Sequence, residues 1–242
     1  MPLIKTKGIN LKSIKVGEAD KIVRLLSREH GKISFIAKGA RRPTSKFGGR
    51  LELFAFNEYL IATGKSLYIL SQAETIENFY SLREDPEKLS AASFILRLVD
   101  ASTAEGQINH QLFDILTQTL SALKNGTDPV TTKIYFELRL MDAEGFFPHL
   151  DGCVRCKRQI TKEPKTVSFN SYLGGLTCTA CTKKTAWGIS VPYDQIKLMK
   201  NLSSFSFDTL KNAPVAPKDA EKLDSILKPH ISEHIGKDIT NW

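Results

Sequence analysis

The chain has four cysteines, and all of them stand in two Cys-x-x-Cys pairs, Cys153/Cys156 and Cys178/Cys181. A Cys-x-x-Cys turn places two sulfur atoms on one side of a tight loop, and two such turns supply the four thiolates of a tetrahedral zinc ion. Four thiolates leave no position for a water molecule, so a site of this kind is structural and not catalytic. The pairs therefore predict one structural Zn²⁺ per chain, in an insertion at about residues 146–190.

Two other interpretations of the cysteines stay open. A thioredoxin-like redox pair stands between a strand and a helix of a βαβ unit, and the pattern around the cysteines contains no such unit. Cysteines without metal are the second alternative. The spacer between Cys156 and Cys178 has 21 residues, one more than the usual range for this zinc pattern, but it contains its own hairpin-like segment, TVSFNSYLGGL. The paired motif favours zinc.

The first twenty residues bear on where the protein works. Lys5, Lys7, Lys12 and Lys15 interrupt the apolar residues there, so the segment resembles neither a signal peptide nor a membrane span. We expect a cytoplasmic, nucleoid-associated protein. In that reducing compartment paired cysteines more often hold a metal or carry out redox chemistry than form a structural disulfide.

The first eighty residues have the pattern of a small β-barrel. Short β-type segments alternate with turn residues such as His30-Gly31, Gly39 and Gly48-Gly49. Five short strands with a basic loop are typical of an oligonucleotide/oligosaccharide-binding (OB) barrel. We expect these strands at residues 3–14, 21–26, 33–37, 51–61 and 67–73.

Beyond residue 80 the hydrophobic period becomes that of a helix. Asp85-Pro86, Asn109 and Asp128-Pro129 are each followed by an apolar stripe at helical spacing, and further helical patterns follow near the C-terminus. The predicted fold class is α+β and multidomain. It consists of an N-terminal five-stranded OB-type β-barrel (residues 1–80) and an α-helical domain (residues 81–242) with the inserted four-cysteine zinc module.

The positive charge of the chain is concentrated in the barrel. The formal net charge is +8, and residues 1–80 contain 14 Lys/Arg against 7 Asp/Glu, a net charge of +7. Such asymmetry suggests an anionic partner for the basic part, most often nucleic acid. A basic surface that serves only solubility is the alternative.

The positive charge is most concentrated in residues 30–51, which contain six Lys/Arg residues and no Asp or Glu. Lys and Arg neutralise phosphates without reading bases. Phe47 lies between glycines and cations in this stretch, so we expect it to stack on bases, whereas the alternation of Phe54 and Phe56 around Ala55 favours the barrel core. The predicted DNA-binding residues are Lys32, Lys38, Arg41, Arg42, Lys46, Phe47 and Arg50.

The stretch GEADKIVRLLSREHGKISFIAKGARRPTSKFGGRLELF resembles the N-terminal barrel of the RecO family, bacterial mediators of DNA repair and recombination. The similarity continues through EGFFPHLDGCVRC, GGLTCTAC and a terminal helix ending HIGK, so it covers essentially the whole chain. The resemblance implies an OB domain joined to a helical domain with a zinc module. It further implies binding of single- and double-stranded DNA, annealing of complementary strands, and work with RecR and the single-stranded-DNA-binding protein, including its C-terminal tail, to help load RecA.

Residue by residue, the resemblance assigns Lys38, Arg41 and Arg42 to the DNA-facing strand and loop and the four cysteines to zinc. The chain departs from the family at its end. Many relatives have further basic residues after the terminal Gly-Lys, whereas this chain has Asp238-Ile239-Thr240-Asn241-Trp242. A basic contribution from that helix end is therefore in doubt.

The sequence offers no convincing catalytic motif, and we predict that the protein is not an enzyme. His230-Ile231-Ser232-Glu233-His234 matches a metalloprotease motif in letters, but it lies in an amphipathic run near the end of the chain, which favours a place in the core. A nuclease would need clustered acids for Mg²⁺, and Glu137, Asp142 and Glu144 do not share one helix face. Among the alternative functions, the runner-up is an OB/zinc protein that binds RNA or associates with the ribosome.

Overall fold

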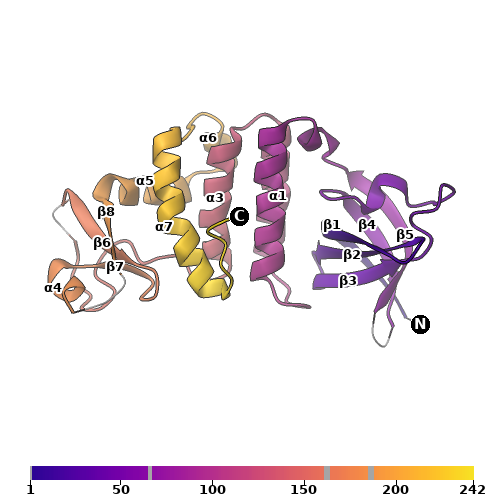
Figure 1. Cartoon of the computed structure of the whole chain (residues 1–242), viewed down its shortest axis with the longest axis horizontal. Coiled ribbons are helices and arrows are strands. Elements are labelled where there is room, and N and C mark those ends of the chain that lie inside the picture. The colour runs from indigo at the N-terminus through magenta and orange to yellow at the C-terminus, as the bar shows by residue number, and fades with distance from the viewer. Residues whose placement is uncertain (1, 65–66, 161–163, 185–187) are drawn as a thin grey trace. The chain divides into compact units, whose positions relative to one another are not determined.

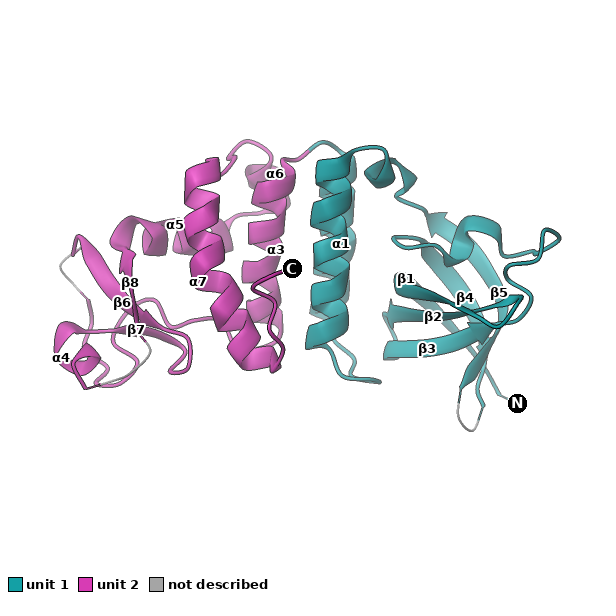
Figure 2. Cartoon of the chain, in the orientation of Figure 1, with its two compact units in different colours: residues 1–126 teal, residues 127–242 magenta. Residues whose placement is uncertain are grey.

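The structure, a computed structural model, describes residues 2–64, 67–160, 164–184 and 188–242. The chain divides into two compact units, residues 1–126 and residues 127–242 (Figure 2). The first unit combines the barrel with the first two helices, so the division falls well beyond the change from strand to helix pattern near residue 80.

In the first unit, five strands close into a barrel in the spatial order β1-β2-β3-β5-β4 (Figure 1). Neighbouring strands are antiparallel, except that β3 and β5 are parallel. A five-stranded Greek-key barrel has the OB architecture, which confirms the predicted fold class. The strands are β1 (Leu3–Val16), β2 (Asp20–Ser27), β3 (Gly31–Ala37), β4 (Phe56–Ala62) and β5 (Tyr68–Glu77).

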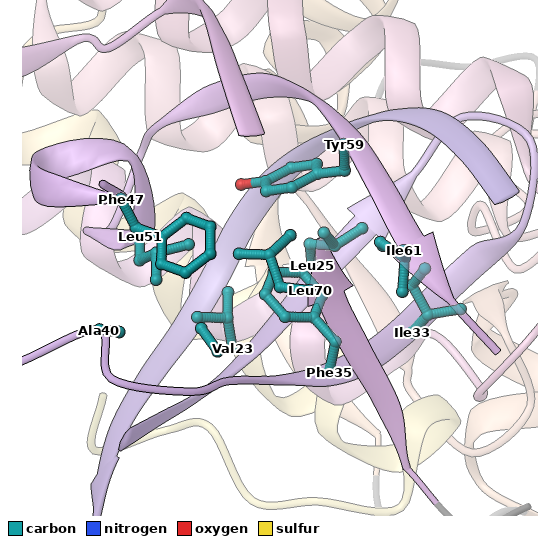
Figure 3. Close-up of a cluster of buried hydrophobic side chains, with 11 residues drawn as sticks. Val23, Leu25, Ile33, Phe35, Ala40, Phe47, Leu51, Tyr59, Ile61 and Leu70 are labelled. Atoms are coloured by element: carbon teal, nitrogen blue, oxygen red, sulfur yellow. The ribbon is translucent and has the colours of Figure 1, made fainter. Parts of the chain in front are cut away.

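Alternate side chains of the strands fill the interior of the barrel, because successive strand residues point to opposite faces. Val23 and Leu25 of β2 and Phe35 of β3 meet Tyr59 of β4 in a buried cluster (Figure 3). The rings of Phe35 and Tyr59 are tilted against each other with their centroids 5.4 Å apart. A partner of the barrel therefore has to bind to its outer surface or its loops.

A polar network at one end of the barrel holds the segment that connects β3 with β4. The Tyr59 hydroxyl donates to Asn10 Oδ1 at 2.5 Å and accepts from Asn57 Nδ2 at 2.6 Å. Asn10 Nδ2 in turn donates to the carbonyls of Arg50 and Glu52, at 2.9 Å each. Buried hydrogen-bonded groups of this kind specify one arrangement of the backbone around them. The network thus fixes residues 50–52 against the barrel.

The fourth strand begins later than predicted. Gly48–Leu51 forms a 3₁₀ turn (η1), and the backbone of Phe54 has a φ of +69°, a left-handed conformation that strands do not contain. β4 therefore starts at Phe56 and not at residue 51. The fifth strand in turn extends to Glu77, past its predicted end at residue 73, and this last residue pairs with Phe56.

The predicted helix caps are confirmed in the first unit. Asp85 accepts hydrogen bonds from two backbone N–H groups of the first turn, and Asn109 accepts one from Leu112. Arg24 of β2 binds Asp100, with 2.9 Å between Nη1 and Oδ1. Such contacts explain why these helices group with the barrel. The unit continues after β5 through η2 (Tyr80–Arg83), α1 (Pro86–Ser102) and α2 (His110–Lys124).

The second unit combines helices with a three-stranded sheet of order β7-β6-β8 (Figure 1). The hairpin expected in TVSFNSYLGGL is confirmed as β6 and β7, with Ser168 opposite Thr177. Within the described ranges, no helix is both long and apolar enough to cross a membrane. The elements are α3 (Pro129–Ala143), β6 (Thr166–Asn170), β7 (Gly175–Thr177), α4 (Thr179–Thr182), β8 (Ile189–Pro192), α5 (Tyr193–Ser204), α6 (Phe207–Leu210) and α7 (Pro217–Ile235).

Candidate functional site

The two Cys-x-x-Cys pairs come together in the second unit. The four sulfur atoms lie within 4.8 Å of one another, and the Sγ atoms of Cys156 and Cys178 are 3.7 Å apart. A tetrahedral zinc ion with Zn–S bonds of about 2.3 Å requires sulfur–sulfur separations of about 3.8 Å. The cysteine set therefore fits a tetrathiolate metal site in both donor chemistry and spacing.

Backbone hydrogen bonds shape both cysteine turns. The carbonyl of Cys178 accepts the N–H groups of Cys181 and Thr182, at 2.9 Å each. The carbonyl of Cys153 accepts the N–H of Lys157 at 2.9 Å, where Lys157 has a left-handed φ of +59°. Because these turns are closed by their own backbone, they hold the sulfur atoms on one side.

The β-structure of the unit joins the two turns, which are distant in sequence. Val154 donates its N–H to the carbonyl of Leu176 in β7 at 2.8 Å, immediately before the second cysteine pair. Gly175 has a φ of +150°, and a Cβ there would lie 2.3 Å from the His149 carbonyl oxygen. Only glycine permits this close approach, so the hairpin and Gly175 decide that the two turns meet.

The electrostatics of the four thiols favour a bound cation. Burial raises the pKa of the Cys153 thiol, but hydrogen bonds from the backbone of Cys156, Cys178 and Arg155 outweigh it and lower the pKa to about 6. Desolvation and the neighbouring sulfurs raise the pKa of Cys181 to about 12. Four thiolates this close repel one another unless a cation lies between them, and metal binding displaces the remaining protons.

In the first unit, the cationic loop, defined as residues 38–50, is fastened to the turn between β1 and β2. The N–H of Gly39 donates to Asp20 Oδ1, the N–H of Arg41 to the Ala19 carbonyl, and Arg41 Nη1 to the Gly17 carbonyl, at 2.8 Å each. OB barrels bind oligonucleotides through their loops and the adjacent strands. The anchored loop thus presents its cations beside a typical binding face.

Four of the predicted DNA-binding cations in the loop are exposed, and a fifth is half-buried. Arg50, the half-buried one, donates through Nη1 to the Lys46 carbonyl at 2.8 Å. The loop therefore gathers five of the predicted cations on one segment, with no carboxylate among its own residues. The exposed ones are Lys38, Arg41, Arg42 and Lys46.

Lys32 does not belong to this surface, which corrects the prediction. The residue is only 7% exposed, and its Nζ donates to the Asp100 carbonyl at 2.7 Å and lies 3.6 Å from Asp100 Oδ1. The register of β3 places Lys32 under the end of α1. The ammonium group loses its hydration there, and a hydrogen-bonding or charged partner has to compensate for that loss. Its charge holds the helix to the barrel and does not face a groove.

The structure also corrects a second prediction, namely that the ring of Phe47 is exposed and free to stack on bases. The residue is 6% exposed and packs into the barrel cluster beside Ala40 and Leu51 (Figure 3). The loop closes one end of the barrel, so burial of the ring in the core replaces contact with water. Lys46 Nζ lies 5.3 Å from the centroid of the Phe47 ring.

We predict that Lys32→Ala lowers the free energy of unfolding by about 1–3 kcal/mol, because the Asp100 carbonyl loses its charged donor while the half-buried Asp100 carboxylate keeps Arg24. The salt dependence of nucleic-acid binding should not change. Chemical denaturation and binding titrations at several salt concentrations measure the two effects, with Lys38→Ala as the exposed control. An unchanged stability together with a weaker salt dependence would place Lys32 in the interface after all.

Two residues near the cationic loop were missed from the sequence. Tyr80 and Arg83 stand in η2, outside the acid-free stretch, and the ring of Tyr80 is 58% exposed. The sequence feature that could have identified them is an aromatic residue three positions before an arginine, at the end of the barrel segment. Of the His230–His234 motif, His230 and Ile231 belong to the core, and the His230 Nε2 bonds to the Phe146 carbonyl at 3.0 Å, whereas Glu233 and His234 are exposed.

The fold and the cysteine site define a class: a protein with an OB barrel, a helical part and a four-cysteine cluster that fits a metal ion. The family models for the recombination protein O N-terminal and C-terminal domains match residues 1–79 and 83–242. The chain belongs to the RecO family.

Relatives named DNA repair protein RecO match nearly the whole chain. The protein from Alkaliphilus metalliredigens is 36% identical over 97% of this chain and 95% of its own length. That from Pelotomaculum thermopropionicum is 31% identical over 100% and 93%, and that from Bacillus subtilis is 30% identical over 97% and 90%. Membership in a DNA repair family follows for both units.

Proposed function

We propose that the chain is a recombination mediator that binds single- and double-stranded DNA through the cationic loop and anneals complementary strands without catalysing a covalent reaction. The exposed cations of the loop, anchored to the β1–β2 turn of an OB barrel, carry this proposal. Membership in the RecO family supports it independently.

The mechanism that we propose is electrostatic. Lys and Arg side chains neutralise backbone phosphates and release counterions, with little preference for sequence. Two complementary strands repel each other, and a protein that screens both while leaving base edges accessible raises the rate at which they meet. No nucleotide hydrolysis is required for this step.

The proposed partners are RecR, the single-stranded-DNA-binding protein with its C-terminal tail, and indirectly RecA. The site of work is the cytoplasm, at the nucleoid. An annealing assay with complementary oligonucleotides coated by the single-stranded-DNA-binding protein, with and without RecR, tests this set. Faster annealing of the coated strands supports the mediator role, and no effect on coated strands contradicts it.

Zinc is the proposed metal of the cysteine site, one ion per chain. Cys153, Cys156, Cys178 and Cys181 would hold it, and their mutual spacing supports this assignment. The ion would cross-link the two turns and would supply no chemistry toward DNA, because four protein ligands would close its coordination sphere.

We predict that Arg41→Ala with Arg42→Ala weakens DNA binding and lowers the slope of log affinity against log salt by about one to two units, since each lost phosphate contact contributes roughly one. Fluorescence anisotropy with labelled DNA at several salt concentrations measures the slope. Lys211→Ala with Lys218→Ala is the control, because it removes the same charge from exposed positions of the other unit.

A double variant of Arg41 and Arg42 with the slope of the wild type would remove the proposed interface from the cationic loop. The RNA-binding alternative is tested by competition between single-stranded DNA and RNA of equal length. Preferential displacement of DNA by RNA would favour that alternative.

A further inference from the structure

We infer that a hollow beside the cationic loop binds one base of a single-stranded nucleic acid, with Tyr80 as its stacking platform. The inference rests on the proposed function and deepens it. The hollow has a volume of about 290 Å³, and its lining includes Arg50, Glu52, Asn78, Tyr80 and Arg83. It lies where the cationic loop ends and the last barrel strand passes into η2.

The exposure of Tyr80 contrasts with that of the other rings near this end of the barrel. Tyr80 is 58% exposed, whereas Phe47, Phe54 and Tyr59 are at most 6% exposed. A single exposed aromatic residue is common on protein surfaces and by itself indicates nothing. Here, however, the ring borders a hollow that two arginines also line.

The backbone around Tyr80 is firmly held. The preceding residue, Phe79, is buried and has a left-handed φ of +44°. The carboxylate of Glu77 accepts the N–H groups of Asn78 at 2.9 Å and Phe79 at 3.3 Å, and Asn78 Oδ1 accepts the N–H of Tyr80 at 3.1 Å. Because Phe79 is anchored in the core, the next side chain is directed outward in a defined position.

Arg83 lies beside this ring. Its Nη2 donates to the Leu53 carbonyl at 2.9 Å, and its Cζ is 5.7 Å from the centroid of Tyr80 and 5.9 Å from that of buried Phe54. A planar guanidinium has five N–H donors, so one bond to a carbonyl leaves others for a phosphate. Arg83 therefore supplies charge over the ring of the platform.

The charge of the hollow suits a phosphate next to a base. Arg50 and Arg83 contribute two positive charges to its lining. The carboxylate that also lines it, Glu52, is paired with Lys21 at 2.6 Å. The hollow is thus cationic, and it continues the cationic loop at its Arg50 end.

Stacking on Tyr80 distinguishes single strands from duplexes. A base in a duplex is already stacked between its neighbours, whereas a base of a single strand can place its face on an aromatic ring. The oxygen of the Asn78 amide is engaged by the Tyr80 N–H, and stacking by itself tolerates every base. The hollow therefore favours single strands with little preference for sequence.

The test compares an oligothymidylate with an abasic oligonucleotide of equal length, which keeps the phosphates but lacks the bases. Tyr80→Ala should lower the affinity for the oligothymidylate about 5- to 100-fold, the effect of losing one stacked base. Its affinity for the abasic strand and for duplex DNA should stay at the wild-type value. Tyr80→Phe should keep the wild-type affinity for all three, because it retains the ring.

Tyr172→Ala is the matched control, since Tyr172 is 74% exposed in the other unit, and thermal melting checks that each variant is folded. The same ratio of oligothymidylate to abasic affinity in Tyr80→Ala and the wild type overturns the inference. So does a loss of affinity for both strands alike in this variant. Failure of the proposed function has a different signature: Arg41→Ala with Arg42→Ala then binds every DNA like the wild type.

Discussion

Replacing Cys178 by serine is expected to leave much less than one zinc ion per chain and to lower the Tm by about 10 °C or more. The reason is the placement of the four sulfur atoms, which lie within 4.8 Å of one another on turns that are far apart in the sequence. The ion is the proposed cross-link between these turns. Without it, the thiolates would repel one another, and backbone hydrogen bonds such as that from Val154 to Leu176 would have to hold the two turns together.

Elemental analysis and differential scanning calorimetry measure the two effects on the same preparation. Thr179→Ser is the control, because it makes a similarly small change inside the second cysteine turn and leaves all four sulfurs in place. Metal stripped from the wild type by a chelator should reproduce the Cys178→Ser result, and returning Zn²⁺ should reverse it. A metal-free wild type with an unchanged Tm contradicts the structural role of the ion.

Replacing Glu137 by glutamine is expected to abolish a loss of stability that accumulates as the pH rises from about 4.5 to about 8. Glu137 of α3 is fully buried, and in the described part of the chain neither of its carboxylate oxygens has a hydrogen-bond partner. Burial raises the pKa of this carboxyl from 4.5 to about 8, against the opposing charge of Lys133. Asp224 of α7 raises the pKa further, and Lys228 lowers it.

The direction of the pH dependence follows from this raised pKa. Between pH 4.5 and about 8 the unfolded chain has lost the Glu137 proton while the folded chain retains it. The contribution of Glu137 to stability is therefore complete below about pH 4.5 and is lost as the pH rises through about 8. At about 1.36 kcal/mol for each pH unit, the loss reaches at most roughly 5 kcal/mol. Glutamine does not titrate and removes this loss.

Urea denaturation of wild type and Glu137→Gln between pH 5 and 9 measures the difference. The two curves should diverge as the pH rises, and Glu221→Gln, at an exposed position of α7, should follow the wild type. Parallel curves would show that Glu137 titrates normally. On the acid side Glu137→Gln should lose stability as the pH falls from about 6.5, because burial lowers the pKa of His230 to about 4, whereas in the wild type the rising contribution of Glu137 offsets this loss down to about pH 4.5.

Much of the fold was predictable because its signals are local. Alternating residues and turn glycines indicated the five barrel strands, and Asp85 and Asn109 marked the starts of helices that they do cap. The paired cysteines predicted a tetrathiolate cluster, and the structure brings their sulfurs together. Alternation, caps and each Cys-x-x-Cys turn depend on the spacing of a few neighbouring residues. The meeting of the two cysteine turns also needs the β6–β7 hairpin and Gly175.

The candidate interface was predictable only in part. A stretch without acidic residues identifies candidate cations, but whether each side chain is exposed depends on which other segments of the chain cover it. Lys32 is covered by the end of α1, and Phe47 fills an open end of the barrel. Tyr80 becomes a candidate binding residue only because Arg50, which is distant in the sequence, lines the same hollow.

The sequence by itself determined the barrel, the helices and the pairing of the cysteines, because periodicity, caps and short spacings act over a few residues. Only the tertiary structure decided which cations face solvent, where β4 begins, and which ring stands beside the cationic loop. Those outcomes depend on neighbours contributed by remote segments: α1 over Lys32, the Asn10–Tyr59 network under residues 50–52, and the anchored Phe79 beside Tyr80.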